Sequence, residues 1–406
     1  LVIDAVLGTG RARPLEGPVK QTMRCLANTR AASSRPKLLA LDLPTGQNSD
    51  TGEVDPLGVP CDVTFALGYP KVGLLNFPGA AHAGDLGVLD IGVPPGLKEE
   101  SEIELELLER SWVAEHLPKR LLDSHKGTFG HVLVVAGSRN YVGAAYLVSQ
   151  ASVRAGAGLT TLATPECVYP IAAAKSTEPI HLPLPDDEEG RVAAEAAQEL
   201  HDASRQYTNI VVGCGLGLSD GTVKFVEELL FRQESSGLTE LPVLVDADGL
   251  NNLARINDWR ERPHGPITLT PHPGEMATLT GLSTPEVQAD RVAVAREYAA
   301  RWNVTLVLKG ANTVIARPDG TVRVASFANP GMASGGTGDV LSGIIGGLMA
   351  QGLAPDIAAS CGVYLHGEAG LEIVSRQGNS GLAASDLLPE IPAAIRRLRE
   401  IWHRSL

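Results

Sequence analysis

The sequence lacks the features that would place it in several common classes. Its five cysteines are odd in number and form no Cys-x-x-Cys pair, which argues against a disulfide framework or a thiolate zinc site and favours reduced thiols in the cytoplasm. No uninterrupted apolar run is long enough to cross a membrane, and no stretch reads as a signal peptide. The net charge is -13 without a basic stripe, so nucleic acid is not an expected partner.

Glycine, in contrast, is abundant, with 44 among 406 residues. A chain of this length exceeds the usual size of one hydrophobic core, so two domains are expected. The first residue, Leu1, already lies within a strand-like run. We therefore expect the chain to begin inside its first domain.

Residues 1–97 have the pattern of a parallel α/β sheet. Strand-like apolar runs span residues 1–7, 38–43, 63–67 and 84–91, with a helical stretch between the first two. In such a sheet ligands bind beyond the carboxyl ends of the strands, where Gly8, Gly10 and Asp42 lie. Plain turn chemistry is the alternative, and for the Gly-Thr-Gly turn alone it is the favoured interpretation. Residues 98–118 then read as a linker whose acidic run is a solvated connector or short helix.

Residues 119–406 predict a second, larger α/β domain of doubly wound type. Strands are expected at 131–136, 159–163, 209–212, 242–245, 267–270 and 304–308. A hairpin joins 313–316 to 321–325 through Pro318-Asp319-Gly320. Polar or glycine-rich residues follow strand after strand, which is where an open α/β sheet places its site.

A glycine loop near the end of the chain is the strongest local signal. Gly335, Gly336 and Gly338 precede Asp339, and the apolar spacing that follows predicts a buried helix ending near Gly352. Unpaired N–H groups and the positive helix dipole would meet at this loop, which suits a phosphate. Asp339 is then either a simple N-cap or a base that takes a proton during phosphoryl transfer.

Four other strand-end features each have a structural explanation when taken alone. His272 could be a turn residue, Asp246 a cap for a helix near Leu250, Lys309 a solvated edge residue, and Gly213 to Gly217 a tight turn. The occurrence of all four features in sequence along one chain favours a catalytic or binding role for them. Phosphoryl transfer needs charge for the phosphates, a base for the acceptor and a walled nucleoside pocket.

The run from Asn329 to Asp339 resembles the anion hole and base of ribokinase-like small-molecule kinases, and within them the nucleotide-dependent NAD(P)H-hydrate dehydratases. That resemblance extends from about Asp123 to Pro392, through His-Lys-Gly-Thr-Phe-Gly at 125–130 and Thr-Pro-His-Pro-Gly-Glu at 270–275. It implies a nucleotide site made by Lys309, Gly310, Ala311, Asn312, Thr313, Gly335, Gly336, Thr337 and Gly338. It implies substrate contacts from Ala144, Gly217, His272 and Asp339, with Asp339 as the catalytic base.

Residues 1–97 resemble the second half of the NAD(P)H-hydrate epimerase domain, through Asp4 to Gly10, Asp42 to Gly52 and Pro70 to Gly73. The resemblance implies potassium ligands at Asp4 and Thr45. It implies substrate contacts at Gly8, Thr9, Gly10, Arg11, Ala12, Arg13, Pro14 and Asp42. Because the first half of that domain is not in the sequence, we expect no epimerase activity.

Together the resemblances imply a cytoplasmic, homo-oligomeric enzyme that repairs NAD(P)H hydrated on its nicotinamide ring. It would use ADP, or ATP as in some relatives, with Mg²⁺ on the phosphates, and K⁺ in the first domain. Two alternatives stay open at this point. One is a vitamin-type kinase of the same superfamily, and the other is a non-catalytic adenylate sensor.

Overall fold

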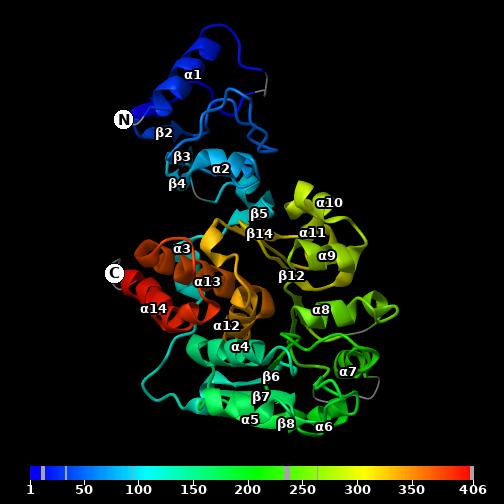
Figure 1. Ribbon diagram of the computed structural model, residues 1–406. Coiled ribbons are helices and arrows are strands. Elements are labelled where there is room, and N and C mark those ends of the chain that lie inside the picture. The colour runs from blue at the N-terminus through cyan, green and yellow to red at the C-terminus, as the bar shows by residue number, and fades with distance from the viewer. Residues whose placement is uncertain (11–13, 33, 95, 233–237, 263, 403–406) are drawn as a thin grey trace. The chain divides into compact units, whose positions relative to one another are not determined.

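The computed structural model describes the chain except residues 11–13, 33, 95, 233–237, 263 and 403–406. The chain forms two compact units, Leu1–Ile103 and Glu104–Leu406 (Figure 1). Both are α/β, as the sequence predicts. None of the helices in the described part of the chain combines the length and apolar character needed to cross a membrane.

The first unit is built on a four-stranded parallel sheet. Its strands lie in the order β1-β2-β3-β4 and are Val2–Asp4, Leu38–Leu41, Val63–Leu67 and Asp85–Leu89. Its helices are α1 (Gly17–Arg30) and α2 (Gly79–Ala83), with 3₁₀ turns η1 (Val72–Leu74) and η2 (Lys98–Glu102). Met23 of α1 is buried in the same apolar cluster as Leu38 and Ala40 of β2, and this cluster holds the helix on the sheet.

The second unit is built on a ten-stranded mixed sheet in the order β5-β14-β13-β12-β11-β10-β9-β6-β7-β8. The strands are β5 Leu105–Leu107, β6 His131–Val135, β7 Leu159–Pro165, β8 Ile180–Leu184, β9 Asn209–Val212, β10 Val243–Val245, β11 Ile267–Leu269, β12 Thr305–Leu308, β13 Thr313–Ala316 and β14 Val322–Ala325. All pairs from β12 to β8 are parallel, and β13 runs antiparallel to both its neighbours. The parallel part therefore directs the carboxyl ends of β9 to β12 to one edge of the sheet.

Helices and 3₁₀ turns cover this sheet. They are α3 Arg110–His116, η3 Lys126–Phe129, α4 Val142–Ala155, α5 Tyr169–Lys175, α6 Ala196–Asp202, η4 Ser204–Gln206, α7 Asp220–Phe231, α8 Asp248–Leu253, η5 Trp259–Glu261, α9 Pro273–Thr280, α10 Thr284–Ala289, α11 Arg291–Trp302, η6 Pro330–Met332, α12 Thr337–Ala350, α13 Pro355–Gln377 and α14 Ala384–Trp402. In Figure 1, α4, α12, α13 and α14 group beside one another, and their apolar residues form the main core.

Helix α12 is the buried centre of this group, and its glycines explain how. A Cβ on Gly343 would lie 2.2 Å from the Val148 carbonyl oxygen of α4, and one on Gly346 would lie 2.3 Å from Val211 of β9. Only glycine therefore lets α12 fit between α4 and the sheet. This packing fixes the start of α12 at the edge of the sheet where β9 to β12 end.

The predicted linker, residues 98–118, is not a simple connector. Strand β5 and helix α3 lie inside it, and β5 pairs in parallel with β14 of the second unit. Glu104 and Glu106 are exposed while Leu105 and Leu107 are half-buried, an alternation that the acidic composition conceals. Val113 of α3 is fully buried. Adjacent charges point to solvent, and the apolar residues between them dock on the core.

Candidate functional site

The site-forming residues of the second unit gather at the carboxyl ends of four neighbouring strands. Cys214 follows β9, Asp246 follows β10, Glu275 lies in α9 after β11, and Lys309 follows β12. Asp339 lies in the first turn of α12, which begins at the same edge. The sheet order thus brings together residues that are far apart in the sequence.

Asp246 and Lys309 form a buried ion pair at the centre of the site. Lys309 Nζ donates to Asp246 Oδ1 at 2.6 Å, and Ser342 Oγ of α12 donates to Oδ2 at 2.7 Å. Asp246 is 1% exposed. The interpretation of Asp246 as a cap is therefore wrong: α8 begins at Asp248, with Ala247 in the capping position.

The interpretation of Lys309 as a solvated edge residue is also wrong. Its side chain is mostly buried, and Nζ lies 3.7 Å from Glu275 Oε2 in addition to its bond to Asp246. Burial alone would lower the pKa of Lys309, but the Asp246 and Glu275 carboxylates raise it above its ordinary value. Burial raises the pKa of Glu275, against the opposing effect of Lys309. Lys309 is therefore a permanent cation facing two acids.

Asp339 is a further carboxylate of this group, and its ionisation is perturbed. Burial and the nearby Asp246 raise the pKa of Asp339 to about 6. The Cys214 sulfur and one carboxylate oxygen each of Asp246 and Asp339 all lie within 4.8 Å of one another. The N-cap of α12 is Gly336, and no side chain caps the helix. Asp339 is therefore not a cap, and burial together with the nearby Asp246 has shifted its pKa towards the range of a general base.

The glycine loop lies directly over the ion pair. A Cβ on Gly338 would lie 3.5 Å from Lys309 Nζ, and one on Gly335 would meet nothing within 4 Å. Gly336 has φ 90° and lies against Leu147 of α4, so the loop needs glycine there as well. Thr337 differs, because its Oγ1 donates to the Met332 and Ser334 carbonyl oxygens and holds the loop together. The loop therefore leaves room for a ligand over Gly335 and Gly338.

The predicted nucleotide segment after β12 is shaped by a residue that the sequence analysis missed. Arg291 of α11 donates to the carbonyl oxygens of Leu308, at 2.8 Å, and of Ala311. Burial lowers the pKa of Arg291 to about 10. Thr313 Oγ1 donates to the Gly310 carbonyl oxygen at 2.9 Å. The turn is thus held from inside, and no local sequence signal connects Arg291 to it.

The predicted substrate contacts lie on two loops and one helix. A Cβ on Gly215 would lie 2.9 Å from Ala144 Cβ at the start of α4, and Gly217 N donates to Asp248 Oδ2 at 2.9 Å. His272 Nδ1 accepts from the Gly274 and Glu275 amides, so it caps α9 as a turn residue does. Its side chain is nevertheless 57% exposed, so the ring can contact a ligand as well.

Cys214 faces two carboxylates but is not a nucleophile. It is fully buried, and burial followed by the charges of Asp339 and Asp246 raises the pKa of its thiol well above the ordinary value. The cluster of Cys214, Asp246 and Asp339 also does not fit Mg²⁺, which prefers oxygen ligands and water. Both Asp246 oxygens already bind Lys309 and Ser342. A magnesium ion would therefore have to reach the site on nucleotide phosphates.

We expect iodoacetamide to leave the turnover of the folded protein unchanged. Cys25 is the exposed cysteine, and it lies in the first unit, whereas Cys214 is buried and protonated. Peptide mass mapping should find the label on Cys25, and Cys25→Ser should remove it. Loss of turnover in parallel with labelling of Cys214 would contradict this assignment.

The first unit brings its own predicted residues together. Thr45 Oγ1 donates to Asp4 Oδ1 at 2.6 Å and Thr45 N donates to Oδ2 at 2.8 Å, with both residues buried. Asp42 has φ 70° and pairs with Lys71, a contact that the sequence analysis did not predict. Gly8 lies against Asp42 Oδ2, and Gly8, Thr9, Gly10 and Pro14 are exposed. The predicted contacts Arg11, Ala12 and Arg13 lie outside the described residues.

Comparison with known proteins adds to this geometry. The NAD(P)H-hydrate dehydratase family profile matches residues 132–393, and that of the YjeF-related protein N-terminus matches residues 1–73. The chain is 42% identical over 405 residues to the bifunctional NAD(P)H-hydrate repair enzyme Nnr of Moorella thermoacetica, covering 98% of this chain and 73% of that protein. The Nnr of Thermofilum pendens is 38% identical, with 98% and 74% covered.

A solved structure shows the same relation for the second unit. The ADP/ATP-dependent NAD(P)H-hydrate dehydratase from Bacillus subtilis, co-crystallised with ATP/Mg²⁺, is 31% identical with a TM-score of 0.63. The match covers 73% of this chain and 99% of that one. The ribokinase-like fold predicted from the sequence is thereby confirmed.

Proposed function

Since this chain belongs to the NAD(P)H-hydrate dehydratase family, in its bifunctional repair form, we propose that Asp339 is the base in its nucleotide-dependent dehydration of S-hydrated NAD(P)H. The observation that carries this proposal is the raised pKa of Asp339, about 6, beside a fixed Asp246–Lys309 pair and an open glycine loop. ADP is the phosphoryl donor, with ATP as a second donor.

The proposed reaction has two stages. Asp339 takes the proton of the ring hydroxyl while that oxygen attacks the terminal phosphorus of ADP, and the bond to the bridging oxygen breaks to release AMP. The amides of residues 335–338 hold the transferred phosphoryl group. The ring C–O bond then breaks and phosphate leaves with the electron pair, while the adjacent ring carbon loses a proton and the double bond returns. The nucleotide is consumed because phosphate leaves more easily than hydroxide.

The remaining residues position the two ligands. Lys309 to Thr313, together with Gly338, would contact the AMP portion, and Ala144, Gly217 and His272 the hydrated cofactor. Mg²⁺ on the phosphates would offset their negative charge. The fixed Lys309 cation near Gly338 supports a phosphate at this place, since the would-be Cβ of Gly338 lies 3.5 Å from Nζ.

Absorbance at 340 nm tests the overall activity. Hydrated NADH mixed with the protein should regain this absorbance when ADP and Mg²⁺ are present. Without a nucleotide the absorbance should not rise. Recovery that does not need a nucleotide would reject the proposed reaction. Accumulation of a stable phosphorylated product would instead indicate a kinase of the same superfamily.

We expect kcat/KM to rise with pH through an apparent pKa of about 6 and to level off above it. The base must be ionised, and Asp339 has a pKa of about 6, so activity should fall about tenfold per pH unit below that value. Initial rates between pH 4.5 and 8.5 measure this limb. A profile that stays flat down to pH 4.5 would exclude Asp339 as the titrating base.

For the first unit we propose a potassium site at Asp4 and Thr45. Both residues are buried and offer side-chain oxygens as ligands, with Thr45 Oγ1 and Asp4 Oδ1 2.6 Å apart. Oxygen ligands suit a hard cation. K⁺ should raise the melting temperature relative to N-methylglucamine at equal ionic strength, and Asp4→Asn should abolish the difference. An equal effect of K⁺ on the melting temperature of that variant would rule out a potassium site at these residues.

We also propose that the protein works in the cytoplasm as a homo-oligomer. The five unpaired cysteines support the compartment, since thiols persist where glutathione keeps them reduced. Leu121 and Leu122 are 68% and 108% exposed and adjacent, which supports burial against another subunit. Analytical ultracentrifugation of the protein and of Leu122→Ser measures the assembly.

A further inference from the structure

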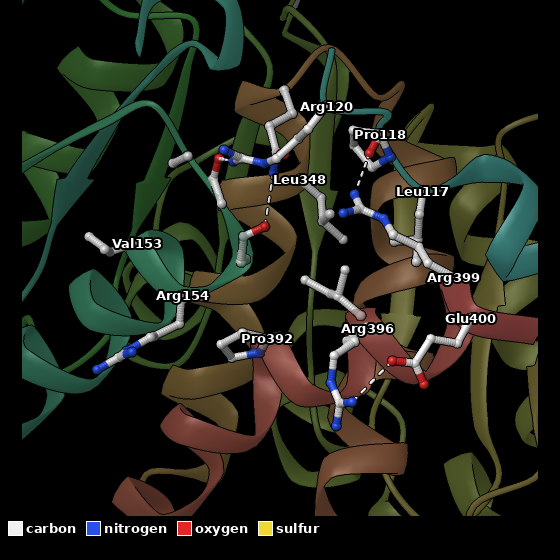
Figure 2. Close-up of a pocket in the computed structure, with 15 residues that line it drawn as sticks. Leu117, Pro118, Arg120, Val153, Arg154, Leu348, Pro392, Arg396, Arg399 and Glu400 are labelled. Carbon is white, nitrogen blue, oxygen red and sulfur yellow. Dashed lines mark hydrogen bonds and ion pairs between the residues drawn. The ribbon is translucent and has the colours of Figure 1, made fainter. Parts of the chain in front are cut away.

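A cavity of about 470 Å³ in the second unit lies away from the residues discussed above. It is bounded by the ends of α4 and α12, by α14, and by the segment between α3 and η3 (Figure 2). Leu348 of α12 and Gln351, which directly follows this helix, form one wall, and they come nine and twelve residues after Asp339. At about 1.5 Å per helical residue, Leu348 lies roughly 14 Å along the helix from Asp339. The cavity is therefore separate from the nucleotide site.

The cavity combines an apolar floor with a basic rim. The floor is made by Leu117, Val153, Leu348, Pro392 and Ile395. The rim carries the four arginines Arg120, Arg154, Arg396 and Arg399 and one acid, Glu400. This concentration of cations opposes the net charge of -13 for the whole chain. A composition of this kind matches a ligand with both an apolar part and an anionic group.

Among the described residues, few carboxylates neutralise this positive charge. Arg396 pairs with Glu400 at 3.0 Å. Within the part of the chain that the structure describes, Arg120, Arg154 and Arg399 make no ion pair with a carboxylate. Burial, together with the neighbouring positive charge of Arg120, lowers the pKa of Arg399. The positive charge of Arg120 thus acts on Arg399, and both residues line the same cavity.

A purely structural role for these arginines explains only part of the arrangement. Arg120 donates to the carbonyl oxygen of Gly156 at the end of α4, and Arg399 donates to that of Pro118 at 2.5 Å. A guanidinium has five N–H donors, so each keeps several for another partner. The C-terminal end of a helix carries about half a negative charge, so the four positive charges of these arginines exceed what it can neutralise. Figure 2 shows Arg120, Arg396 and Arg399 around the apolar floor, with Arg154 pointing away from them.

We propose that this cavity binds a small molecule that carries a phosphate group on an apolar body. The phosphate would lie between Arg120 and Arg399, whose planar guanidinium groups suit its oxygens, and Arg396 would add a third cation. The apolar body would lie on Leu348 and Ile395. Such a site goes beyond the proposed dehydration, since none of its residues takes part in that reaction.

Calorimetry with phenyl phosphate, inorganic phosphate and citrate tests the proposal, with saturating ADP present to fill the nucleotide site. Phenyl phosphate should bind about tenfold more tightly than inorganic phosphate, because the floor buries its ring. Arg399→Gln should weaken phenyl phosphate about tenfold or more by removing a charged hydrogen bond. Arg255→Gln, at an exposed arginine beyond α8, is the matched control and should change nothing.

Arg396→Gln provides a second variant at an exposed position, should Arg399→Gln melt abnormally. It should weaken phenyl phosphate while leaving the melting temperature unchanged. No binding in the presence of ADP, or equal binding by both variants and the wild type, would overturn the proposal. Citrate binding as tight as phenyl phosphate would also overturn it, by assigning the cavity to carboxylates. Turnover is not the readout, so failure here is distinct from failure of the dehydratase assignment.

Discussion

Asp339→Asn should lower turnover by about 10²–10⁴-fold while leaving the protein folded. The amide keeps the size of the side chain but cannot accept the proton of the ring hydroxyl. ADP affinity should hold or rise, because a negative charge near the phosphates is removed. Turnover is measured at 340 nm and affinity by calorimetry. A variant with wild-type turnover would end the catalytic assignment.

The same variant should be more stable than the wild type at pH 8. The pKa of Asp339 is about 6 in the folded protein and near 3.8 when unperturbed. The folded state thus binds an extra proton between these values, and its stability falls as pH rises through that window. Asp339→Asn removes this cost, so its melting temperature should exceed that of the wild type at pH 8 and approach it near pH 4. A lower melting temperature at pH 8 would instead indicate a structural role for the carboxylate.

Lys309→Met should lower the free energy of unfolding by about 3–5 kcal/mol, because it leaves the buried Asp246 carboxylate without its cation. The pair has a separation of 2.6 Å, and Asp246 is 1% exposed, so the carboxylate depends on the ammonium group for its compensating charge. ADP affinity should also fall by about 1.5–3 kcal/mol through loss of a charged contact. Urea unfolding and calorimetry measure the two effects separately.

A double variant distinguishes loss of the pair from loss of packing. Lys309→Met with Asp246→Asn removes both charges, so it should recover a large part of the lost stability while ADP affinity stays low. Lys224→Met, at an exposed position of α7, is the control and should unfold like the wild type. If the double variant is no more stable than Lys309→Met, the ion pair is not the source of the effect.

The sequence predicted best those helices and strands whose pattern depends only on their own residues. Strands β9 and β13 have the predicted bounds, and the helix after the glycine loop is buried as its apolar spacing indicates. Strand bounds shifted where polar residues end the pairing early: the strand expected over residues 1–7 ends at Asp4, whose side chain turns to Thr45. Strand β5 was missed because its glutamates look like a solvated run.

The site was predictable as a set of motifs, but its electrostatics were not. Nothing local distinguishes Asp246 as the partner of Lys309 from Asp246 as a cap, because the two residues are 63 positions apart. The same holds for Ser342, which is 96 positions from Asp246, and for Arg291 behind residues 308–311. These contacts depend on strand order and on the depth at which α12 packs. The Gly336 cap likewise depends on φ 90°, which only the folded loop determines.

The fate of the ring oxygen tests the central claim most directly, namely that Asp339 promotes phosphorylation of the hydroxyl before it leaves. Hydrated NADH prepared in H₂¹⁸O carries the label on that hydroxyl, and a single turnover with ADP in ordinary water releases phosphate for mass spectrometry. The account predicts one ¹⁸O in each phosphate released, with equal amounts of AMP and NADH. Unlabelled phosphate, with the ¹⁸O in water, would show that the hydroxyl leaves without phosphorylation and would contradict the mechanism.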